Sequence, residues 1–283
     1  MWIDLIWRFP VTWSQEERPT HVRIDPLPPV DHSQLHYPLV RFNLYKEHTF
    51  VAAMSEQEVA RVRGDRELNV SGWQAPRPVI AIDHLGFPRQ LEEAIQRAGF
   101  SQPTPIQSQA LPAALSGRDV LGLARTGSGK TMAFVWPLIV HILDQPMMAA
   151  GDGPIGLVLA PTRELCVQIY SESRRFAKPF NIRVCAVFGG ASKYEMKKAL
   201  LEYPELVVAT PGRLIDLIEM KATNLQRVTM LVVDEADRLL EMGFEHQVRS
   251  IMNNVRPDRQ TLMFSATMRK KIEVGLRCFV LHR

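Results

Sequence analysis

The amino-acid sequence predicts an α/β fold in which a parallel β-sheet is covered by helices on both faces. From about residue 80 onward, short apolar runs rich in β-branched residues alternate with longer amphipathic runs. The apolar runs are continuous, which is typical of strands buried on both faces. In open sheets of this kind, ligands bind beyond the carboxyl ends of the strands. The residues that follow each strand are therefore the first candidates for function.

Six segments are expected to form strands and three are expected to form helices between them. The strands are residues 119–123, 155–160, 183–188, 206–209, 229–233 and 261–264. The helices are residues 164–178, 194–202 and 244–255. Alternation of strand and helix indicates right-handed crossover connections between parallel strands.

Residues 1–79 differ in composition and are expected to form an N-terminal extension of mostly irregular structure. Residues 14–36 are rich in proline, histidine and charge, which disfavours helix. Ser55 and Glu58 have the spacing of a capping box, so a short helix is expected near residues 55–63. Residues 80–283 are expected to form the main domain.

The composition is that of an ordinary globular protein, with 46% hydrophobic and 23% charged residues among 283. These values exclude wholesale disorder. The net charge of +4 permits a polyanionic partner without requiring one. The three cysteines are few and far apart, which argues against a disulfide framework or a zinc site and favours a reducing compartment. The longest apolar run, residues 133–143, is too short to span a bilayer, so no membrane partner is expected.

A glycine-rich segment follows the first predicted strand and precedes a helix. Such a turn lets backbone N–H groups point at phosphate oxygens, and the helix N-terminus adds positive potential. Lys130 is expected to reach the terminal phosphates, and the Thr131 hydroxyl to hold Mg²⁺. The alternative is a glycine-rich turn that binds nothing. The predicted nucleotide-binding residues here are Arg125, Thr126, Gly127, Ser128, Gly129, Lys130 and Thr131.

Another predicted strand, residues 229–233, ends in the acidic segment 234–237. A metal bound together with phosphates needs a carboxylate on a neighbouring strand. Asp234 is expected to hold Mg²⁺, largely through water, and Glu235 to orient and deprotonate an attacking water. Lys130, Asp234 and Glu235 are thus the predicted catalytic residues. The alternative is a charged helix N-terminus, where the helix dipole favours acidic residues.

Seven motifs in this order resemble those of the DEAD-box ATP-dependent RNA helicases of helicase superfamily two. The resemblance covers roughly residues 80–272 and rests on residues 99–107, 124–131, 161–165, 189–190, 210–213, 234–237 and 265–267. It implies a RecA-like P-loop NTPase domain. It also implies an enzyme in which ATP binding and hydrolysis drive remodelling of RNA duplexes or RNA–protein complexes, with ATP and Mg as cofactors.

The resemblance assigns adenine recognition to Gln107, whose side-chain amide can pair bidentately with a base. The family has an aromatic residue 25 positions before this glutamine, where the present sequence has Ile82. Weaker adenine stacking is therefore expected. Phe100 is equally compatible with a position in the core and with a ligand contact.

The resemblance also implies a group of residues, called here the RNA face, that grips the sugar–phosphate backbone without reading bases. Each has a structural alternative, such as a helix N-cap for Thr162 or a helix start for Thr210. By the same resemblance, Asp237, Ser265 and Thr267 couple the nucleotide site to RNA strand separation, with a hydroxyl-capped turn as the alternative. The RNA face comprises Pro161, Thr162, Arg163, Gly189, Gly190, Thr210, Pro211, Gly212 and Arg213.

The sequence at residues 28–32, 37–38, 69–72, 76–78, 151–155 and 221–228 resembles that of one DEAD-box branch, which is associated with the snRNP that recognises the intron branch site. This similarity implies spliceosomal protein partners and a nuclear location, with the cytoplasm as the alternative. The family carries two RecA-like domains, whereas 16 residues follow Thr267. We therefore expect a monomer, truncated after the Ser-Ala-Thr motif, that lacks the second domain and hydrolyses ATP slowly alone. The alternative function is a non-catalytic RNA- or protein-binding remnant of a helicase.

Overall fold

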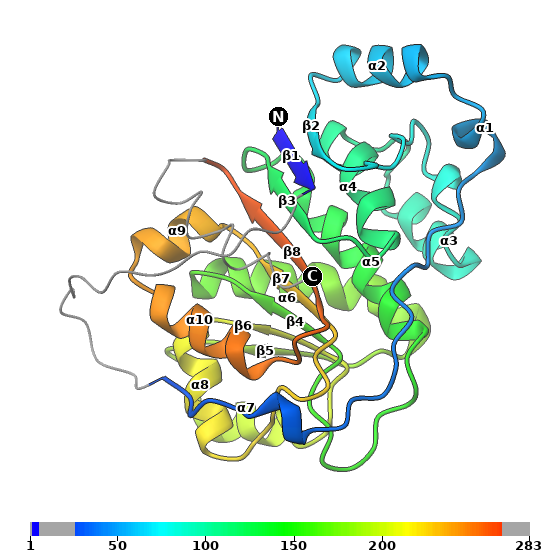
Figure 1. Cartoon of the computed structure of the whole chain (residues 1–283). Coiled ribbons are helices and arrows are strands. Elements are labelled where there is room, and N and C mark those ends of the chain that lie inside the picture. Colours follow the sequence, from blue (N-terminus) through cyan, green and yellow to red (C-terminus); the bar gives the residue numbers. More distant parts are fainter. Residues whose placement is uncertain (1, 6–25, 268–283) are drawn as a thin grey trace.

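The computed structural model describes residues 2–5 and 26–267 of the chain (Figure 1). Its centre is a sheet with the strand order β2-β1-β3-β8-β7-β4-β6-β5. Strands β3, β8, β7, β4, β6 and β5 are all parallel, which confirms the predicted fold class. Their bounds match the predicted segments closely: β3 Val120–Leu123, β4 Gly156–Leu159, β5 Val184–Val187, β6 Leu206–Ala209, β7 Met230–Val233 and β8 Gln260–Ser265.

The six parallel strands are largely buried on both faces because most of their residues are apolar. In β7, Met230 and Val232 join one hydrophobic cluster, while Leu231 and Val233 join the other. This alternation follows from the two-residue period of a strand. Side chains at the carboxyl ends of the strands are therefore held on a rigid edge.

Helices cover both faces of this sheet (Figure 1). One cluster contains residues of α3 to α6, including Trp136 and Phe176. The other contains residues of α7 to α10, including Leu214 and Ile251. The helices are α3 Arg89–Arg97, α4 Pro105–Leu115, α5 Lys130–Leu143, α6 Arg163–Ala177, α7 Lys193–Leu200, α8 Pro211–Glu219, α9 Ala236–Glu241 and α10 Glu245–Asn254. Short 3-10 turns occur at His32–Gln34, Asp83–Leu85 and Lys178–Phe180.

The N-terminal extension contains more regular structure than the sequence predicted. The expected helix is present as α2, Glu56–Asp65, and the Ser55 backbone N–H donates to Glu58 Oε2 at 2.8 Å, as in a capping box. A short helix, α1 Thr49–Ala52, precedes it. In addition, β1 Trp2–Leu5 pairs parallel to β2 Asn69–Gly72 and antiparallel to β3. The extension therefore enlarges the sheet by two strands.

Residues 26–45 of the extension run along the domain and are fixed at several points. Leu27 is buried, and its N–H donates to Ser250 Oγ at 2.7 Å. The buried Arg256 donates to the carbonyl of Pro38 at 2.8 Å and lies 4.8 Å from the centre of the Tyr37 ring. Of the expected irregular segment 14–36, residues 14–25 lie outside the described residues.

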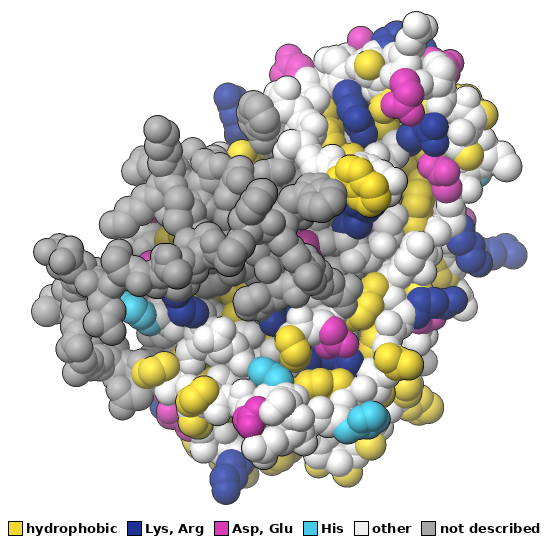
Figure 2. Space-filling model, in the orientation of Figure 1, with side chains coloured by type: hydrophobic (Ala, Val, Ile, Leu, Met, Phe, Trp, Pro, Cys, Tyr) yellow, Lys and Arg dark blue, Asp and Glu magenta, His cyan; other side chains and the backbone are white. Residues whose placement is uncertain are grey.

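The surface in the orientation of Figure 1 carries interspersed basic and acidic side chains (Figure 2). This distribution agrees with the small net charge of +4. Within the described part of the chain, no helix is both long and apolar enough to cross a membrane. Cys166 and Cys185 are free thiols in the interior, and burial raises the pKa of each to about 12.

Candidate active site at the carboxyl ends of the strands

The glycine-rich segment forms the turn between β3 and α5, as predicted. Gly127 and Gly129 have φ angles of 80° and 87°, which residues with a Cβ rarely adopt. At Gly129 space is also restricted, because a Cβ there would lie 2.7 Å from Gln107 Nε2. The turn leads directly into α5, which begins at Lys130.

Lys130 and Asp234 form a buried ion pair at the centre of this edge. The Lys130 ammonium lies 3.6 Å from Asp234 Oδ1, and both residues are buried. Burial raises the pKa of Asp234, and the nearby Lys130 charge opposes that rise. Lys130 Nζ and Ser128 Oγ have no hydrogen-bond partner among the described residues. Since buried polar atoms are normally paired, the Lys130 ammonium is available to a ligand with acceptor oxygens.

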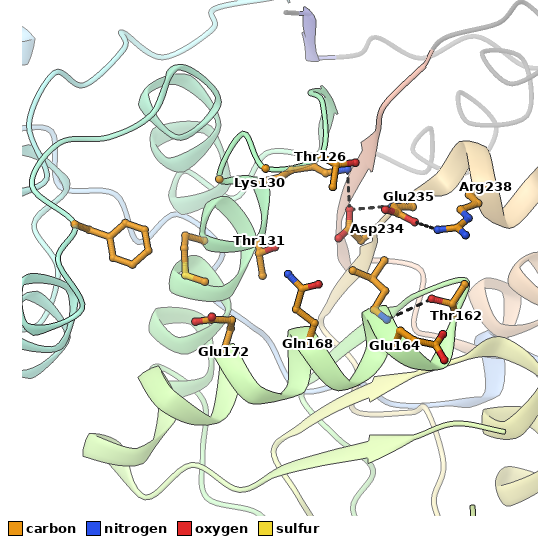
Figure 3. Close-up of a pocket in the computed structure, with 15 residues that line it drawn as sticks. Thr126, Lys130, Thr131, Thr162, Glu164, Gln168, Glu172, Asp234, Glu235 and Arg238 are labelled. Atoms are coloured by element: carbon orange, nitrogen blue, oxygen red, sulfur yellow. Dashed lines mark hydrogen bonds and ion pairs between the residues drawn. The ribbon is translucent and has the colours of Figure 1, made fainter. Parts of the chain in front are cut away.

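Glu235 occupies a strained backbone position directly after Asp234. Its φ and ψ of 48° and 51° place a residue with a Cβ in the left-handed region. Such a conformation costs about 1–3 kcal/mol, and strain of this kind gathers at functional sites. The carboxylate accepts a hydrogen bond from Arg238 Nη1 at 3.2 Å, within the first turn of α9. The bend therefore presents Glu235 beside the Lys130–Asp234 pair (Figure 3).

These residues line one open cavity of about 390 Å³ (Figure 3). Eight of the predicted site residues line it: Thr126, Gly127, Gly129, Lys130, Thr131, Thr162, Asp234 and Glu235. Arg125 and Ser128 belong to the same turn but are not among the lining residues. The structure therefore brings the glycine-rich turn and the acidic strand end together.

Sequence reasoning missed four polar or charged residues that line the same cavity: Glu164, Gln168, Glu172 and Arg238. The first three are spaced by four residues on α6, so they share one face of that helix. This spacing was visible in the sequence and could have identified them. The position of Arg238 depends on the left-handed bend at Glu235, which has no sequence signal.

Gln107 is fully buried, and both ends of its amide are occupied in this structure. Its Nε2 donates to the Gly129 carbonyl at 2.9 Å, while its Oε1 accepts from the Thr104 N–H at 3.0 Å. Ile82 is 9% exposed and belongs to the hydrophobic core. Phe100 combines both predicted alternatives, since it lines the cavity and packs edge-on against Trp136 with ring centres 5.3 Å apart.

The RNA face is assembled around the loop that follows β5. Arg163 Nη1 lies 3.5 Å from the Gly190 carbonyl, and Arg213 Nη1 donates to the Ala191 carbonyl at 3.0 Å. Arg163 also lies 5.1 Å from the centre of the Phe188 ring. The starts of α6 and α8 and the loop after β5, which are distant in sequence, therefore converge here.

Several RNA-face residues also have the structural roles that were considered as alternatives. Thr162 Oγ1 accepts from the Leu165 N–H at 3.3 Å, as an N-cap of α6. Thr210 is the residue before α8, and Pro211 is the first residue of that helix. The exposed or partly exposed members are Thr162, Arg163, Gly189, Gly190, Thr210 and Arg213, whereas Pro161, Pro211 and Gly212 are buried.

Asp237 connects the acidic strand end with the end of β8. Its Oδ2 accepts hydrogen bonds from the N–H and the hydroxyl of Thr267, both at 2.9 Å. Ser265 Oγ donates to the Thr267 carbonyl at 2.8 Å, which fixes the turn after β8. The three predicted coupling residues thus form one contact chain.

The sequence profile of the DEAD/DEAH box helicase family matches residues 104–274, more than half of the chain. The chain belongs to the DEAD/DEAH box helicase family. It is 56% identical over 255 residues to the human ATP-dependent RNA helicase DDX42, covering 90% of this chain and 27% of that protein. It is 55% identical over 251 residues to DEAD-box ATP-dependent RNA helicase 24 of rice, covering 89% and 33%.

Solved structures agree with this family assignment. The yeast DEAD-box splicing factor Prp28 superposes with a TM-score of 0.77 at 36% identity, covering 82% of this chain and 56% of that chain. Prp28 from Chaetomium thermophilum, bound to ADP, gives 0.75 at 39% identity, covering 81% and 56%. The chain thus spans roughly a third or less of the length of the curated DEAD-box relatives named above.

The residues of this DEAD-box site fit a nucleotide phosphate and Mg²⁺. The Lys130 ammonium, which has no hydrogen-bond partner among the described residues besides its ion pair with Asp234, is a donor suited to phosphate oxygens. Mg²⁺ prefers oxygen ligands and usually keeps several waters while it contacts one or two protein groups and the substrate phosphates. Thr131 and Asp234, which line the same cavity, are the residues that would hold it.

Proposed function

We propose that this chain is the ATP-binding part of an ATP-dependent RNA helicase. In this proposal the cavity at Lys130 binds the phosphates of ATP, the RNA face binds an RNA backbone, and Asp237 couples the two. The observation that carries the proposal is the buried Lys130 ammonium, which lies 3.6 Å from Asp234 and has no hydrogen-bond partner among the described residues.

In the proposed reaction, the chain's own groups position the phosphates and activate water. Bound Mg²⁺ supplies neutralisation of phosphate charge. Lys130 holds the terminal phosphates, and the N–H groups of the glycine-rich turn bind the remaining oxygens. Glu235 accepts the proton of the attacking water on its Oε1, while its Oε2 keeps the hydrogen bond from Arg238. Gln107 recognises the adenine only if its amide gives up the contacts to Thr104 and Gly129.

The RNA face supports binding that does not depend on base sequence. Its exposed groups are guanidiniums, hydroxyls and glycine backbone, which suit phosphate and sugar contacts. Arg163 and Arg213 are placed by carbonyls of the same loop, residues 188–191. Binding through such contacts weakens steeply as the salt concentration rises.

ATP hydrolysis by this chain alone is proposed to be slow. Among the described residues that line the cavity, the cations are Lys130 and Arg238, and Arg238 is paired with Glu235. An additional arginine that contacts the transferred phosphoryl group is worth about 10³–10⁵ in rate in P-loop enzymes. We propose that a second RecA-like domain supplies this group.

We further propose a role in nuclear RNA processing, with spliceosomal proteins as partners and a monomeric chain. The structural similarity to Prp28, a splicing factor, supports this proposal. So does the resemblance of the N-terminal flank to a spliceosomal branch of the family.

The decisive experiment is to measure ATP turnover by the purified chain, with and without single-stranded RNA, alongside Lys130→Ala. We expect nucleotide binding that is lost in Lys130→Ala, and slow turnover by the chain alone. Fast turnover that RNA stimulates and Lys130→Ala abolishes would show a self-sufficient ATPase. Wild-type protein that binds no nucleotide would contradict the proposal.

The second candidate is a non-catalytic RNA- or protein-binding remnant. The observation that favours it is Ile82, which is buried in the core where the family has an aromatic residue for the adenine. RNA binding without any measurable binding of ATP or ADP would support this candidate.

A further inference from the structure

A basic pocket that the proposed function does not use lies at the C-terminal end of α6. Its cavity measures about 460 Å³, and no carboxylate lines it among the described residues. We call it the α6 basic pocket. It is lined by Ser171, Arg174, Arg175, Lys178, Asn181 and Ile182.

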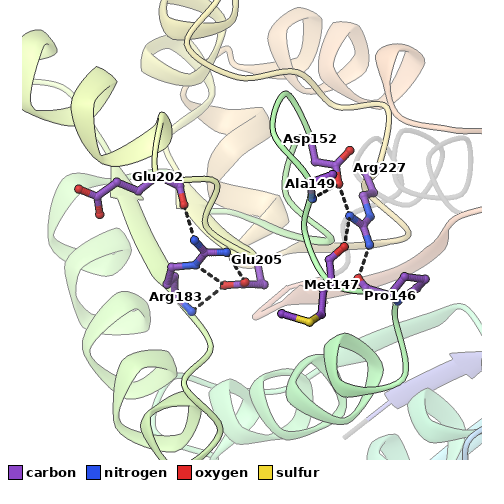
Figure 4. A network of polar contacts seen from close by, with 8 residues as sticks. All are labelled: Pro146, Met147, Ala149, Asp152, Arg183, Glu202, Glu205 and Arg227. Atoms are coloured by element: carbon purple, nitrogen blue, oxygen red, sulfur yellow. Dashed lines mark hydrogen bonds and ion pairs between the residues drawn. The ribbon is translucent and has the colours of Figure 1, made fainter.

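The three cations of this pocket are exposed and form no ion pair within the described part of the chain. The Arg175 guanidinium lies 5.7 Å from the centre of the Phe176 ring. Arg183, which follows the pocket residue Ile182, is already paired with Glu205, whose Oε1 lies 2.6 Å from Arg183 Nη2 (Figure 4). That pair adds no net charge, so the positive charge of the pocket stays uncompensated.

The helix dipole explains only part of this arrangement. Cations in the last turn of a helix offset the negative end of its dipole, which accounts for Arg174 and Arg175. It also favours Lys178, the C-cap of α6, but it does not account for a concave surface that includes two neutral hydrogen-bonding side chains, Ser171 and Asn181. Cations combined with hydroxyl and amide groups are the usual partners of nucleic-acid phosphates.

Two residues of the pocket, Arg174 and Lys178, lie toward the side of α6 that carries Arg163 of the RNA face, whereas Ser171 and Arg175 are rotated from it by about 80° and 120°. Arg174 and Lys178 follow Arg163 by 11 and 15 positions, which at 3.6 residues per turn returns them to one side of the helix. Glu164 and Gln168, which line the nucleotide cavity, are rotated from Arg163 by about 100° and 140°, so that side of α6 adjoins the pocket. At 1.5 Å per residue, Arg174 lies about 17 Å from Arg163 along the helix axis and Lys178 about 22 Å from it.

We propose that the α6 basic pocket binds backbone phosphates of RNA that extends beyond the segment held at Arg163, Gly190 and Arg213. This inference rests on the proposed function. It specifies which surface of the domain the additional nucleotides of a longer RNA contact. A stacked strand carries one phosphate per about 3.4 Å, so the distance corresponds to about five to seven nucleotides. The pocket therefore binds longer RNA and does not contact a short one.

The test compares binding of single-stranded RNAs of about 6 and about 18 nucleotides by fluorescence anisotropy over a range of salt concentrations. The variant Arg174→Glu/Lys178→Glu reverses two charges of the pocket. The matched control, Lys197→Glu/Lys198→Glu, reverses two charges on α7, whose buried residues belong to the hydrophobic cluster on the opposite face of the sheet. If Arg174→Glu/Lys178→Glu does not fold, the neutral variant Arg174→Gln/Lys178→Gln is measured in its place.

We expect the wild type to bind the longer RNA more tightly than the shorter one. The pocket reversal should lower affinity for the longer RNA by about tenfold or more and leave the shorter RNA nearly unaffected. The slope of log K against log salt should fall in magnitude by about 1.4, since each phosphate contact in single strands contributes about 0.7. Binding of a fluorescent ATP analogue should not change.

Equal binding of both RNAs, or an equal loss in the α7 control, would overturn this inference and leave the proposed function intact. Failure of the wild type to bind either RNA while it binds the ATP analogue would overturn both. Binding of a polyglutamate peptide that needs Arg174 and Lys178, with RNA binding unaffected by their reversal, would assign the pocket to an acidic protein segment instead.

Discussion

A single carboxylate oxygen of Asp237 accepts two hydrogen bonds from Thr267, from its backbone N–H and from its hydroxyl, both at 2.9 Å. Asp237 belongs to the acidic segment that also carries Asp234 and Glu235, and Thr267 follows the end of β8. The pair therefore connects the proposed catalytic carboxylates with the turn after a neighbouring strand. We propose that this contact couples the nucleotide site to the position of that turn.

The variant Thr267→Val tests this connection, because it removes the hydroxyl and nearly preserves the shape. We expect ATP binding within about twofold of wild type and a clear loss of RNA-stimulated turnover. Stability should fall by about 1 kcal/mol, the typical contribution of one hydrogen bond. Thr223→Val is the control, since Thr223 lies in the loop after α8 and outside the residues that line the nucleotide cavity. Unchanged RNA stimulation in Thr267→Val would argue against a coupling role.

Gly129→Ala and Gly127→Ala separate backbone strain from lack of space in the glycine-rich turn. Both residues have φ near 80–87°, so either alanine should cost about 1–2 kcal/mol in unfolding free energy. At Gly129 the new Cβ would also meet Gln107 Nε2 at 2.7 Å, whereas at Gly127 it meets nothing within 4 Å. Displacing Gln107 breaks its hydrogen bond to the Gly129 carbonyl. Urea unfolding should show an additional loss of about 1 kcal/mol for Gly129→Ala, and equal losses would contradict this account.

Glu235→Gln tests the proposed general base. The amide cannot accept the proton of the attacking water, and general-base catalysis is typically worth about 10²–10⁴ in rate. We expect turnover to fall by such a factor while nucleotide affinity stays close to that of the wild type. Glu219→Gln, on the exposed end of α8, controls for the loss of a carboxylate. Wild-type turnover in Glu235→Gln would assign proton transfer to another group.

The strands and the two halves of the nucleotide site could be predicted because their signals are local. A continuous apolar run followed by glycines or acids specifies both a buried strand and the chemistry at its end. Strand β2, Asn69–Gly72, gave no such signal, because its four residues include a single large apolar side chain. Its pairing depends on β1, far away in the sequence.

The contacts within the site were less predictable, because they depend on how distant segments pack. Gln107 has the amide expected for a base contact, yet packing between α4 and the glycine-rich turn satisfies that amide with backbone groups. Arg238 reaches Glu235 because of the left-handed bend between β7 and α9. Neither relationship follows from residue spacing alone.

The pair of Glu205 and Arg183 predicts a pH-dependent contribution to stability (Figure 4). Burial raises the pKa of Glu205, but hydrogen bonds from the Arg183 side chain and backbone outweigh this effect and hold it below its ordinary value. The folded state therefore binds fewer protons at this carboxyl than the unfolded chain does. Its stabilisation is present above the ordinary glutamate pKa and is lost as the pH falls through the lowered value.

Glu205→Gln should therefore lower the free energy of unfolding at pH 7 by about 1 kcal/mol, a modest value because Arg183 is half-exposed. The difference from wild type should shrink as the pH is lowered from 5 to 3, since the wild-type carboxylate is then protonated as well. Urea unfolding of both proteins at a series of pH values measures this difference, with Glu219→Gln as the control. A destabilisation of the same size at pH 3 and pH 7 would show that Glu205 acts through packing, because only its charged form can pair with Arg183.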